Sequence, residues 1–288
     1  MHELTKPVKA NNFFKERRML AIKNNIMAGT AARHLGTSYD ALAKSVERLS
    51  SGLRINSSKD DAAGLAVREL MRADIRVLQQ GARNAQDGIS MLQTMEGALG
   101  VVDDALVRMK ELAEQASTES YSDAQRNIMD AEFQEMGAEI TRIANTTDFN
   151  GIKMLNSAAG QVTIHFGASS ELTVNMADIR SSGLGIDALS ISSTASAKAA
   201  LSTITSAIIT KDSARASFGY KMNRLESSAE VLGIQAENLS TAESRVSDVD
   251  VATEMATMTR NQVLAQAGVS MLAQANGMPQ MALSLLRG

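Results

Sequence analysis

Apolar residues recur along most of this chain at alternating steps of four and three residues, which is the spacing of helices that pack along their length against other helices. Four runs follow it, over residues 35–49, 71–116, 129–143 and 218–239. The second run predicts one helix from about residue 60 to 117, roughly 85 Å long at 1.5 Å per residue, and a helix that long needs partners along all of it. Aromatic residues make up only 3% of the chain, which favours thin helix-on-helix packing. We therefore predict a mainly α fold, an elongated antiparallel bundle of coiled-coil helices.

A different pattern occurs between the third and fourth runs. The segments VTIHFG and LTVNM alternate apolar and polar residues on either side of residues 167–171, and the turn-forming DFNG precedes them. Such alternation predicts a small β-hairpin region, which we place at about residues 149–191, at the distal tip of the bundle. The residues that follow, 192–206, are rich in Ser, Thr and Ala, and we expect a loop there.

The stretch SSGLRINSSKDD, residues 50–61, separates the first two runs. Ser57 or Ser58, followed three residues later by an aspartate, is similar to a capping box. In that arrangement the serine caps a helix and the acid lies near its positive end. We therefore expect a helix to begin here, and we assign the paired carboxylates to capping instead of acid–base catalysis.

The segment from residue 261 to residue 286 contains no charged residue. Its Gln, Asn, Ser and Gly content is too high for a lipid-spanning helix, yet a monomer that exposed it would be prone to association. The other helical runs already have apolar seams of their own. Burial between many copies of the same chain is therefore the predicted solution.

No set of residues supports an enzyme, a metal site or a cofactor site. Cysteine is absent, the three histidines are scattered, and neither an HExxH motif nor a GxxxxGK[ST] loop occurs. The net charge of −3 argues against a nucleic-acid partner. We expect no catalytic residues, no metal and no cofactor.

The N-terminal residues 1–18 carry five positive charges but no apolar stretch of the kind a secretory signal peptide requires. The chain also lacks a run of 18 apolar residues that could cross a membrane. We expect residues 1–18 to be an extension from an upstream start codon and the working protein to begin at Met19.

Two motifs near the N-terminus, SSGLRINSSKDDAAGLA and RNAQDGISMLQTMEGAL, resemble the signature of bacterial flagellins, and the end of the chain, from ESRVSDVDV to MALSLLRG, is similar to the C-terminal signature of that family. The resemblance implies an inner-core domain of terminal helices, residues 19–63 plus 249–288, and an outer helical domain, residues 64–248, that includes the hairpin. The chain resembles a minimal flagellin that lacks the large variable outer domains.

The resemblance also implies a function. A flagellin is a structural subunit, not an enzyme, that is secreted by the flagellar export route without a cleaved signal peptide and self-assembles into the extracellular filament that propels the cell. The implied partners are further copies of the chain, the export apparatus, a secretion chaperone, and the filament cap and hook-junction proteins, with no nucleic acid and no membrane. For polymerisation we expect a seam formed by Leu35, Leu42, Val46, Leu49, Val263, Leu264, Met271, Leu272, Leu285 and Leu286. We expect Ser50, Ser51, Gly52 and Asn56 to form an interdomain connector that permits small adjustments.

One motif implies a further partner. The segment LVRMKELAEQ resembles the family's LQRVRELAVQ, the surface that an innate immune Toll-like receptor recognises in many flagellins. The positions that match are Arg108, Glu111 and Leu112, with Glu132 aligned to an acidic position on the neighbouring helix. The positions that depart from the motif are Val107, Met109, Lys110 and Glu114. Packing between subunits is the alternative role of these residues.

Two other roles are alternatives to a filament subunit. A hook–filament junction protein shares coiled-coil ends but resembles STGKRVNNPSDDP where this chain has SSGLRINSSKDDAAG. A secreted adhesin or translocator that binds membranes would need a charged face opposite an apolar one. The difference in that motif disfavours the junction protein, and residues 261–286, which offer no charged face, disfavour the adhesin or translocator.

Overall fold

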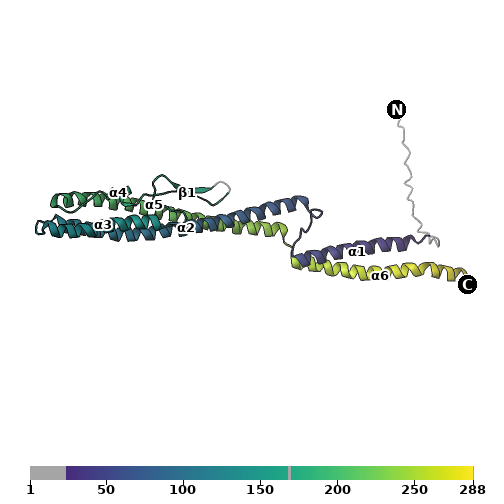
Figure 1. Cartoon of the computed structure of the whole chain (residues 1–288). Coiled ribbons are helices and arrows are strands. Elements are labelled where there is room, and N and C mark those ends of the chain that lie inside the picture. Colours follow the sequence, from purple (N-terminus) through teal and green to yellow (C-terminus); the bar gives the residue numbers. More distant parts are fainter. Residues whose placement is uncertain (1–23, 168–169, 288) are drawn as a thin grey trace, which may run out of the picture. The chain divides into compact units, whose positions relative to one another are not determined.

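The computed structural model of the chain describes residues 24–167 and 170–287, and most of them are helical (Figure 1). The elements in chain order are α1 (Ile26–Ser51), α2 (Ala62–Ser117), α3 (Asp123–Thr146), β1 (Gln161–His165), β2 (Glu171–Asn175), α4 (Ser181–Leu184), α5 (Thr194–Ser247) and α6 (Val251–Arg287). The two strands form an antiparallel pair in which Thr163 lies opposite Thr173. The predicted mainly α fold with a small hairpin is confirmed. The expected position of the hairpin at the distal tip is wrong, because its strands lie beside residues 81–88 of α2, well before α2 turns into α3 at residues 118–122 (Figure 1).

The chain divides into two compact units. The first, which we call the terminal unit, takes in the described residues up to 66 and from 246 onward, and the second, the outer unit, comprises residues 67–245. The boundaries expected from the sequence lie after residue 63 and before residue 249. The expected extension, residues 1–18, lies outside the described residues.

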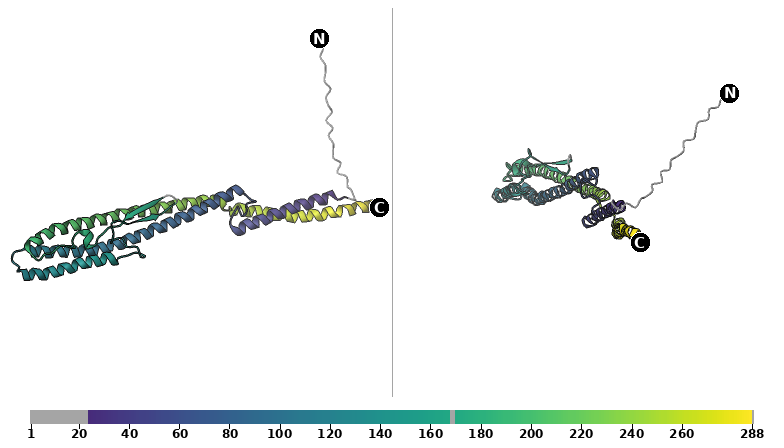
Figure 2. Two further views of the ribbon diagram at one scale, coloured as in Figure 1. Left: turned by 45° about the horizontal axis from the view of Figure 1, so that its top comes forward. Right: turned by 90° about the vertical axis from the view of Figure 1, so that its right-hand side faces the viewer.

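In the outer unit, α2, α3 and α5 run side by side (Figures 1 and 2). Ion pairs from α2 fix the antiparallel course of α5, because Arg72 contacts Glu243 at 3.6 Å and Glu96 contacts Arg215 at 3.3 Å. A continuous apolar core fills the space between these helices and the hairpin. Its central stripe on α2 consists of Met95, Leu99, Val102, Leu106 and Met109, all 0% exposed. These positions step by four and three residues, as the sequence pattern predicted.

The hairpin packs on α2 at two glycines of the helix, Gly81 and Gly88. A Cβ atom added to Gly81 would lie 2.8 Å from the backbone carbonyl of Phe166, and one added to Gly88 would lie 2.5 Å from Cδ1 of Ile164. Between them, the Asn84 side-chain amide donates a hydrogen bond of 2.9 Å to the carbonyl of His165. Glycine at these two places lets the strand approach the helix closely.

The loop expected over residues 192–206 is wrong, because α5 already begins at Thr194. Alanine favours helix, and Ala197, Ala200 and Ile204 are buried at helical spacing. The hydroxyl groups bond back to earlier carbonyls, as Thr205 does to Leu201 at 2.8 Å. Ser and Thr therefore meet their hydrogen-bonding needs within the helix itself.

In the terminal unit, α1 and α6 lie antiparallel (Figures 1 and 2). The Asn25 side-chain amide donates to the carbonyl of Ala275 at 2.8 Å, and at the other end Arg48 pairs with Glu254 at 3.4 Å. Within the described residues, no helix has the length and apolar character that a membrane span requires.

Candidate functional site

The polymerisation seam predicted on α1 divides into two faces. Leu35, Leu42 and Leu49 are half-buried where α6 covers the helix, whereas Val46 is 51% exposed. Tyr39, one helical turn from Leu35 and Leu42, is exposed to the same degree. The covered positions step by three and four residues: Ala28, Ala31, Leu35, Ser38, Leu42, Ser45 and Leu49. Within one chain the leucines are thus interleaved with small serines and alanines, and Tyr39 and Val46 remain uncovered.

Helix α6 shows the same division. The positions that face α1 are Glu254, Met258, Asn261, Ala265, Gly268, Leu272 and Ala275, which again step by four and three residues. Gly268 lies so close to Leu35 that an added Cβ atom would be 3.1 Å from the Cδ1 atom of that leucine. Three of the predicted seam residues, Val263, Leu264 and Met271, instead lie half or more exposed on the remaining faces. The side chains of Leu285 and Leu286 lie outside the described residues.

The uncovered part of α6 combines apolar side chains with an absence of charge. Val263, Leu264, Val269 and Met271 are each 49% exposed or more, and residues 261–286 carry no Asp, Glu, Lys or Arg. α1 covers only one stripe of the helix, so this unit cannot bury its apolar surface by itself. Chemically, the arrangement suits helix-on-helix contact with a further apolar surface and offers no group for catalysis.

The connector is held by specific hydrogen bonds instead of being loosely extended. Ser50 and Ser51 end α1, and Gly52 closes it in the left-handed conformation, with φ 73°. The Asn56 amide donates to the Ser51 hydroxyl at 2.8 Å, and the amide of Val249 donates to the carbonyl of Gly52 at 3.0 Å. The two chain segments that leave the terminal unit are therefore fastened to each other.

Asp60 and Asp61 hold different parts of this connector. Asp61, not Ser57 or Ser58, caps α2: its carboxylate accepts from the amide of Gly64 at 2.8 Å. The Asp60 carboxylate accepts from the amides of Asn56 and Ser57 and pairs with Lys44 Nζ on α1 at 2.7 Å. The hydrogen bond from Lys44, followed by those backbone amides, lowers the pKa of Asp60 to about 2. The expected serine cap is wrong because the chain first closes a turn at residues 57–60.

Three of the four residues predicted to contact a receptor form a charged cluster across α2 and α3. Arg108 lies 2.8 Å from Glu132 on α3 and 3.2 Å from Glu111 one turn along its own helix. Hydrogen bonds to Glu132 and then to Glu111 raise the pKa of Arg108 above its usual value. All three side chains are exposed, so the cluster is available to a partner.

Leu112 does not belong to that exposed cluster. Its side chain is 2% exposed and is part of the apolar core of the outer unit. Helical geometry explains this, because Leu112 continues a core-facing stripe of α2 that includes Met109. The assignment of Leu112 to a contact surface is therefore wrong for the folded outer unit.

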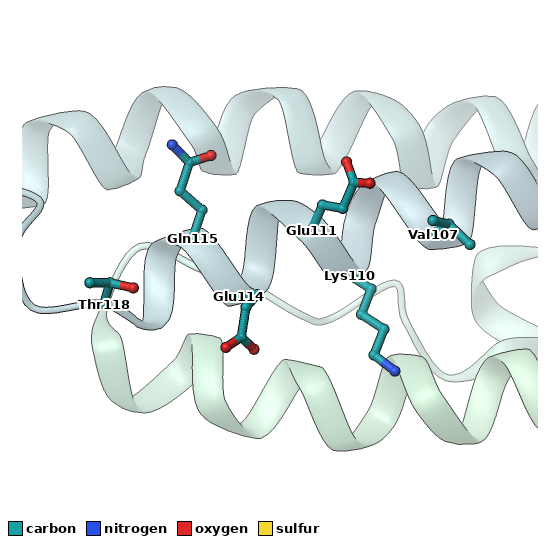
Figure 3. Close-up of a pocket in the computed structure, with 6 residues that line it drawn as sticks. All are labelled: Val107, Lys110, Glu111, Glu114, Gln115 and Thr118. Carbon is teal, nitrogen blue, oxygen red and sulfur yellow. The ribbon is translucent and has the colours of Figure 1, made fainter.

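A shallow hollow of about 520 Å³ lies beside this cluster along α2 (Figure 3). Its lining residues are Val107, Lys110, Glu111, Glu114, Gln115 and Thr118. Glu111 and Gln115 point to one side of the helix, and Lys110 and Glu114 point to the other. Three of the positions that depart from the receptor motif therefore lie in this hollow, next to the positions that match it.

The outer unit contains a buried lysine ion pair that was not predicted from the sequence. Lys211 of α5 is 1% exposed and its ammonium group contacts Asp103 of α2 and, at 2.7 Å, Asp212. A lysine at a seam position between two apolar stripes is the signal that could have revealed it. Within the ranges that the structure describes, no group of three or more His, Cys, Asp or Glu side chains could hold a metal ion.

Comparison with known proteins gives a consistent result. The family model of the bacterial flagellin N-terminal helical region matches residues 22–159, and that of the C-terminal helical region matches residues 201–286. The chain is 43% identical over 272 residues to a flagellin of Halalkalibacterium halodurans, covering 93% of this chain and 100% of the relative. It is 39% identical over 287 residues to flagellin FlaB2 of Treponema pallidum, with the same two coverages.

A solved structure shares the fold. A Vibrio parahaemolyticus protein described as hook-associated superposes with a TM-score of 0.57 at 15% identity, over 66% of this chain and 100% of that one. At this identity the likeness concerns the fold alone. The two terminal matches, in the same order as in the family, carry the assignment.

Proposed function

The chain belongs to the bacterial flagellin family, and we propose that it polymerises by burying the uncovered apolar faces of α1 and α6 between copies of itself. As a flagellin without large outer domains, it is a structural subunit of the flagellar filament and not an enzyme. The observation that carries the proposed mechanism is the exposed, uncharged face of α6, which includes Val263, Leu264 and Met271. Identical copies that bury such faces against each other in a head-to-tail manner form an open helical polymer.

The predicted seam residues have two roles in this proposal. Leu35, Leu42, Leu49 and Leu272 join α1 to α6 within one chain, as their half-buried positions support. Val46 and the exposed residues of α6 contact neighbouring copies, and we extend the same role to Leu285 and Leu286. Apolar burial yields about 25 cal/mol per Å², so a continuous face of this kind can drive association.

Truncation after Ser247 tests the mechanism. Because this removes α6 and leaves the outer unit complete, we expect a folded, helical chain that forms no filaments under conditions in which the full chain polymerises. Negative-stain electron microscopy and circular dichroism measure the two properties separately. Filaments from the truncated chain would contradict the proposal.

The export apparatus, a secretion chaperone, and the filament cap and hook-junction proteins are further partners that we propose from family membership. The proposed route is flagellar export without a cleaved signal peptide, to the extracellular filament. A secretion assay that compares cells with and without a working flagellar export apparatus tests this route. Equal amounts of the chain outside both kinds of cell would contradict it.

The charged cluster of Arg108, Glu111 and Glu132 supports a second proposal, recognition by a flagellin-sensing Toll-like receptor. Arginine is enriched in contact hot spots, and Arg108 is exposed and held in place by two carboxylates. We expect Arg108→Ala to reduce receptor activation by monomers at least about tenfold in a reporter-cell assay. The matched control is Arg142→Ala, which breaks a similar exposed pair with Glu139, 2.6 Å away on α3. Equal activity of the Arg108 variant and the parent chain would contradict this proposal.

A further inference from the structure

Methionine side chains are distributed very differently in the two units. The chain contains 17 methionines. Among the described residues, exposed methionines occur only on α1 and α6: Met27, Met255, Met271 and Met281, at 48%, 44%, 62% and 52% exposure. In the outer unit, by contrast, no described methionine is exposed, and Met91, Met95, Met109 and Met154 are at most 4% exposed.

Exposure decides which of these thioethers can react with an oxidant in solution. Methionine sulfur is oxidised to the sulfoxide, which turns a flexible apolar side chain into a polar one and disrupts methionine-rich contacts. Met271 and Met281 lie in the uncharged segment of α6, and Met255 lies two turns before that segment begins. These three sulfurs are therefore accessible in the single chain and lie on or next to the face that polymerisation is proposed to bury.

We propose that Met255, Met271 and Met281 are oxidation sites through which hydrogen peroxide prevents the unassembled chain from polymerising. The inference rests on the proposed function, because it requires that the faces of α6 meet other copies. In each reaction the sulfur lone pair attacks one peroxide oxygen, the O–O bond breaks, and an S–O bond forms. The sulfur loses two electrons, and the hydroxide that leaves takes up the proton of the transferred oxygen, which gives the sulfoxide and one water.

The consequence follows from the cost of desolvating a sulfoxide oxygen. In a contact between apolar helix faces that oxygen meets no hydrogen-bond donor, so its burial is unfavourable. The fully buried methionines of the outer-unit core, such as Met91 and Met95, are shielded from solvent and should react slowly. The oxidised chain thus keeps its outer fold but loses affinity for other copies, and enzymatic reduction of the sulfoxides restores that affinity.

The test treats the full chain with hydrogen peroxide, removes the peroxide with catalase, and maps sulfoxides by peptide mass spectrometry. We expect the three α6 methionines to react at least about tenfold faster than Met91 and Met95. The critical concentration for polymerisation, measured by sedimentation, should rise about tenfold or more, and methionine sulfoxide reductases should reverse the rise. Peroxide added after polymerisation should leave the same three residues largely unmodified. This part of the test uses the parent chain, without any substitution.

A triple variant, Met255→Leu, Met271→Leu and Met281→Leu, assigns the effect to these sulfurs. Each chain is compared with itself before and after treatment, so any effect of leucine on polymerisation cancels. Both chains carry Met27→Leu for this comparison, because Met27 is the other exposed methionine among the described residues. The ratio of critical concentrations should stay near one for the variant and rise for the chain that keeps the three α6 methionines.

The outcomes separate the two proposals. An untreated parent chain that forms no filaments would contradict the proposed function. Normal polymerisation of the fully oxidised parent chain, or ready oxidation of the three α6 residues within filaments, would overturn the inference about methionine while leaving the proposed function intact.

Discussion

The outer unit and the terminal unit are built from helices with the same heptad spacing, yet they differ in how much of that pattern one chain satisfies. In the outer unit, Leu99, Leu106 and Ile140 are fully buried in a core that three long helices share. In the terminal unit, two helices cover only one stripe of each other, and Val263 remains 58% exposed. The same sequence pattern therefore specifies a fold in one unit and an incomplete surface in the other.

The number of available partners explains the difference. A pair of helices can cover only part of each apolar face, whereas a third helix and a hairpin close the core of the outer unit. Helix α6 adds small residues on its covered stripe, Ala265, Gly268 and Ala275, which give close approach but bury little area. The terminal unit thus leaves much of its apolar surface exposed in the single chain, and this is the surface that we propose other copies cover.

Matched leucine substitutions sharpen the comparison most strongly. Leu99→Ala leaves a cavity in a closed core, and we expect it to lower the free energy of unfolding of the outer unit by about 2–5 kcal/mol. Leu264→Ala removes a half-exposed side chain of the terminal unit and should change the free energy of unfolding of that unit by less than about 0.5 kcal/mol, while it raises the critical concentration for polymerisation. Urea unfolding of the monomer and sedimentation of polymers measure the two effects. A destabilised Leu264→Ala monomer would show that α6 is already buried within one chain.

Two glycines of α2 test how closely the outer unit is packed. A Cβ atom at Gly81 would meet the backbone of Phe166, whereas one at Gly97 has nothing within 4 Å. We expect Gly81→Ala to destabilise the outer unit by about 1–3 kcal/mol, because the hairpin must move. Gly97→Ala should stabilise the same unit by about 0.5–1 kcal/mol, because alanine favours the helix. Thermal unfolding by circular dichroism compares them, and equal melting temperatures would contradict the close contact.

The smallest expected effect is a change in the pKa of Asp60, in the connector between α1 and α2. The folded-state pKa of Asp60, about 2, lies below its ordinary value of 3.8, so the contribution of its hydrogen bonds to stability is complete above pH 3.8 and is lost as the pH falls through about 2. Lys44→Met removes the largest cause of this shift, and we expect the pKa of Asp60 to move up toward 3.8.

An NMR titration of the Asp60 carboxyl carbon measures this pKa in both chains. Lys59→Met is the matched control, because it removes the lysine next to Asp60 in the sequence, whereas the lysine that pairs with Asp60 is Lys44. An unchanged pKa in the Lys44→Met chain would mean that the backbone amides alone hold the carboxylate.

Much of the architecture could be predicted from the sequence because heptad spacing, turn residues and strand alternation are local signals. They placed α2, α3 and the hairpin close to their observed positions. The start of α5 was missed because Ser and Thr are common in loops, and only the buried positions of Ala197 and Ala200 show that tertiary packing favours a helix there.

The candidate surface was harder to predict than the fold. A heptad pattern shows which residues are apolar but not which of two adjoining stripes the chain covers itself, so Ser38 and Ser45 were not anticipated beside Leu42. The exposed position of Arg108 and the buried position of Leu112 likewise depend on the rotation of α2 about its axis, which only the packed structure provides.

Hydrogen–deuterium exchange of the full chain, measured by mass spectrometry as monomer and as filament, tests the central claim most directly. The account predicts that amides of α1 and α6 exchange much faster than those of α2 in the monomer and become as protected as α2 in the filament, with little change in the outer unit. Strong protection of α1 and α6 in the monomer, unchanged on polymerisation, would contradict it.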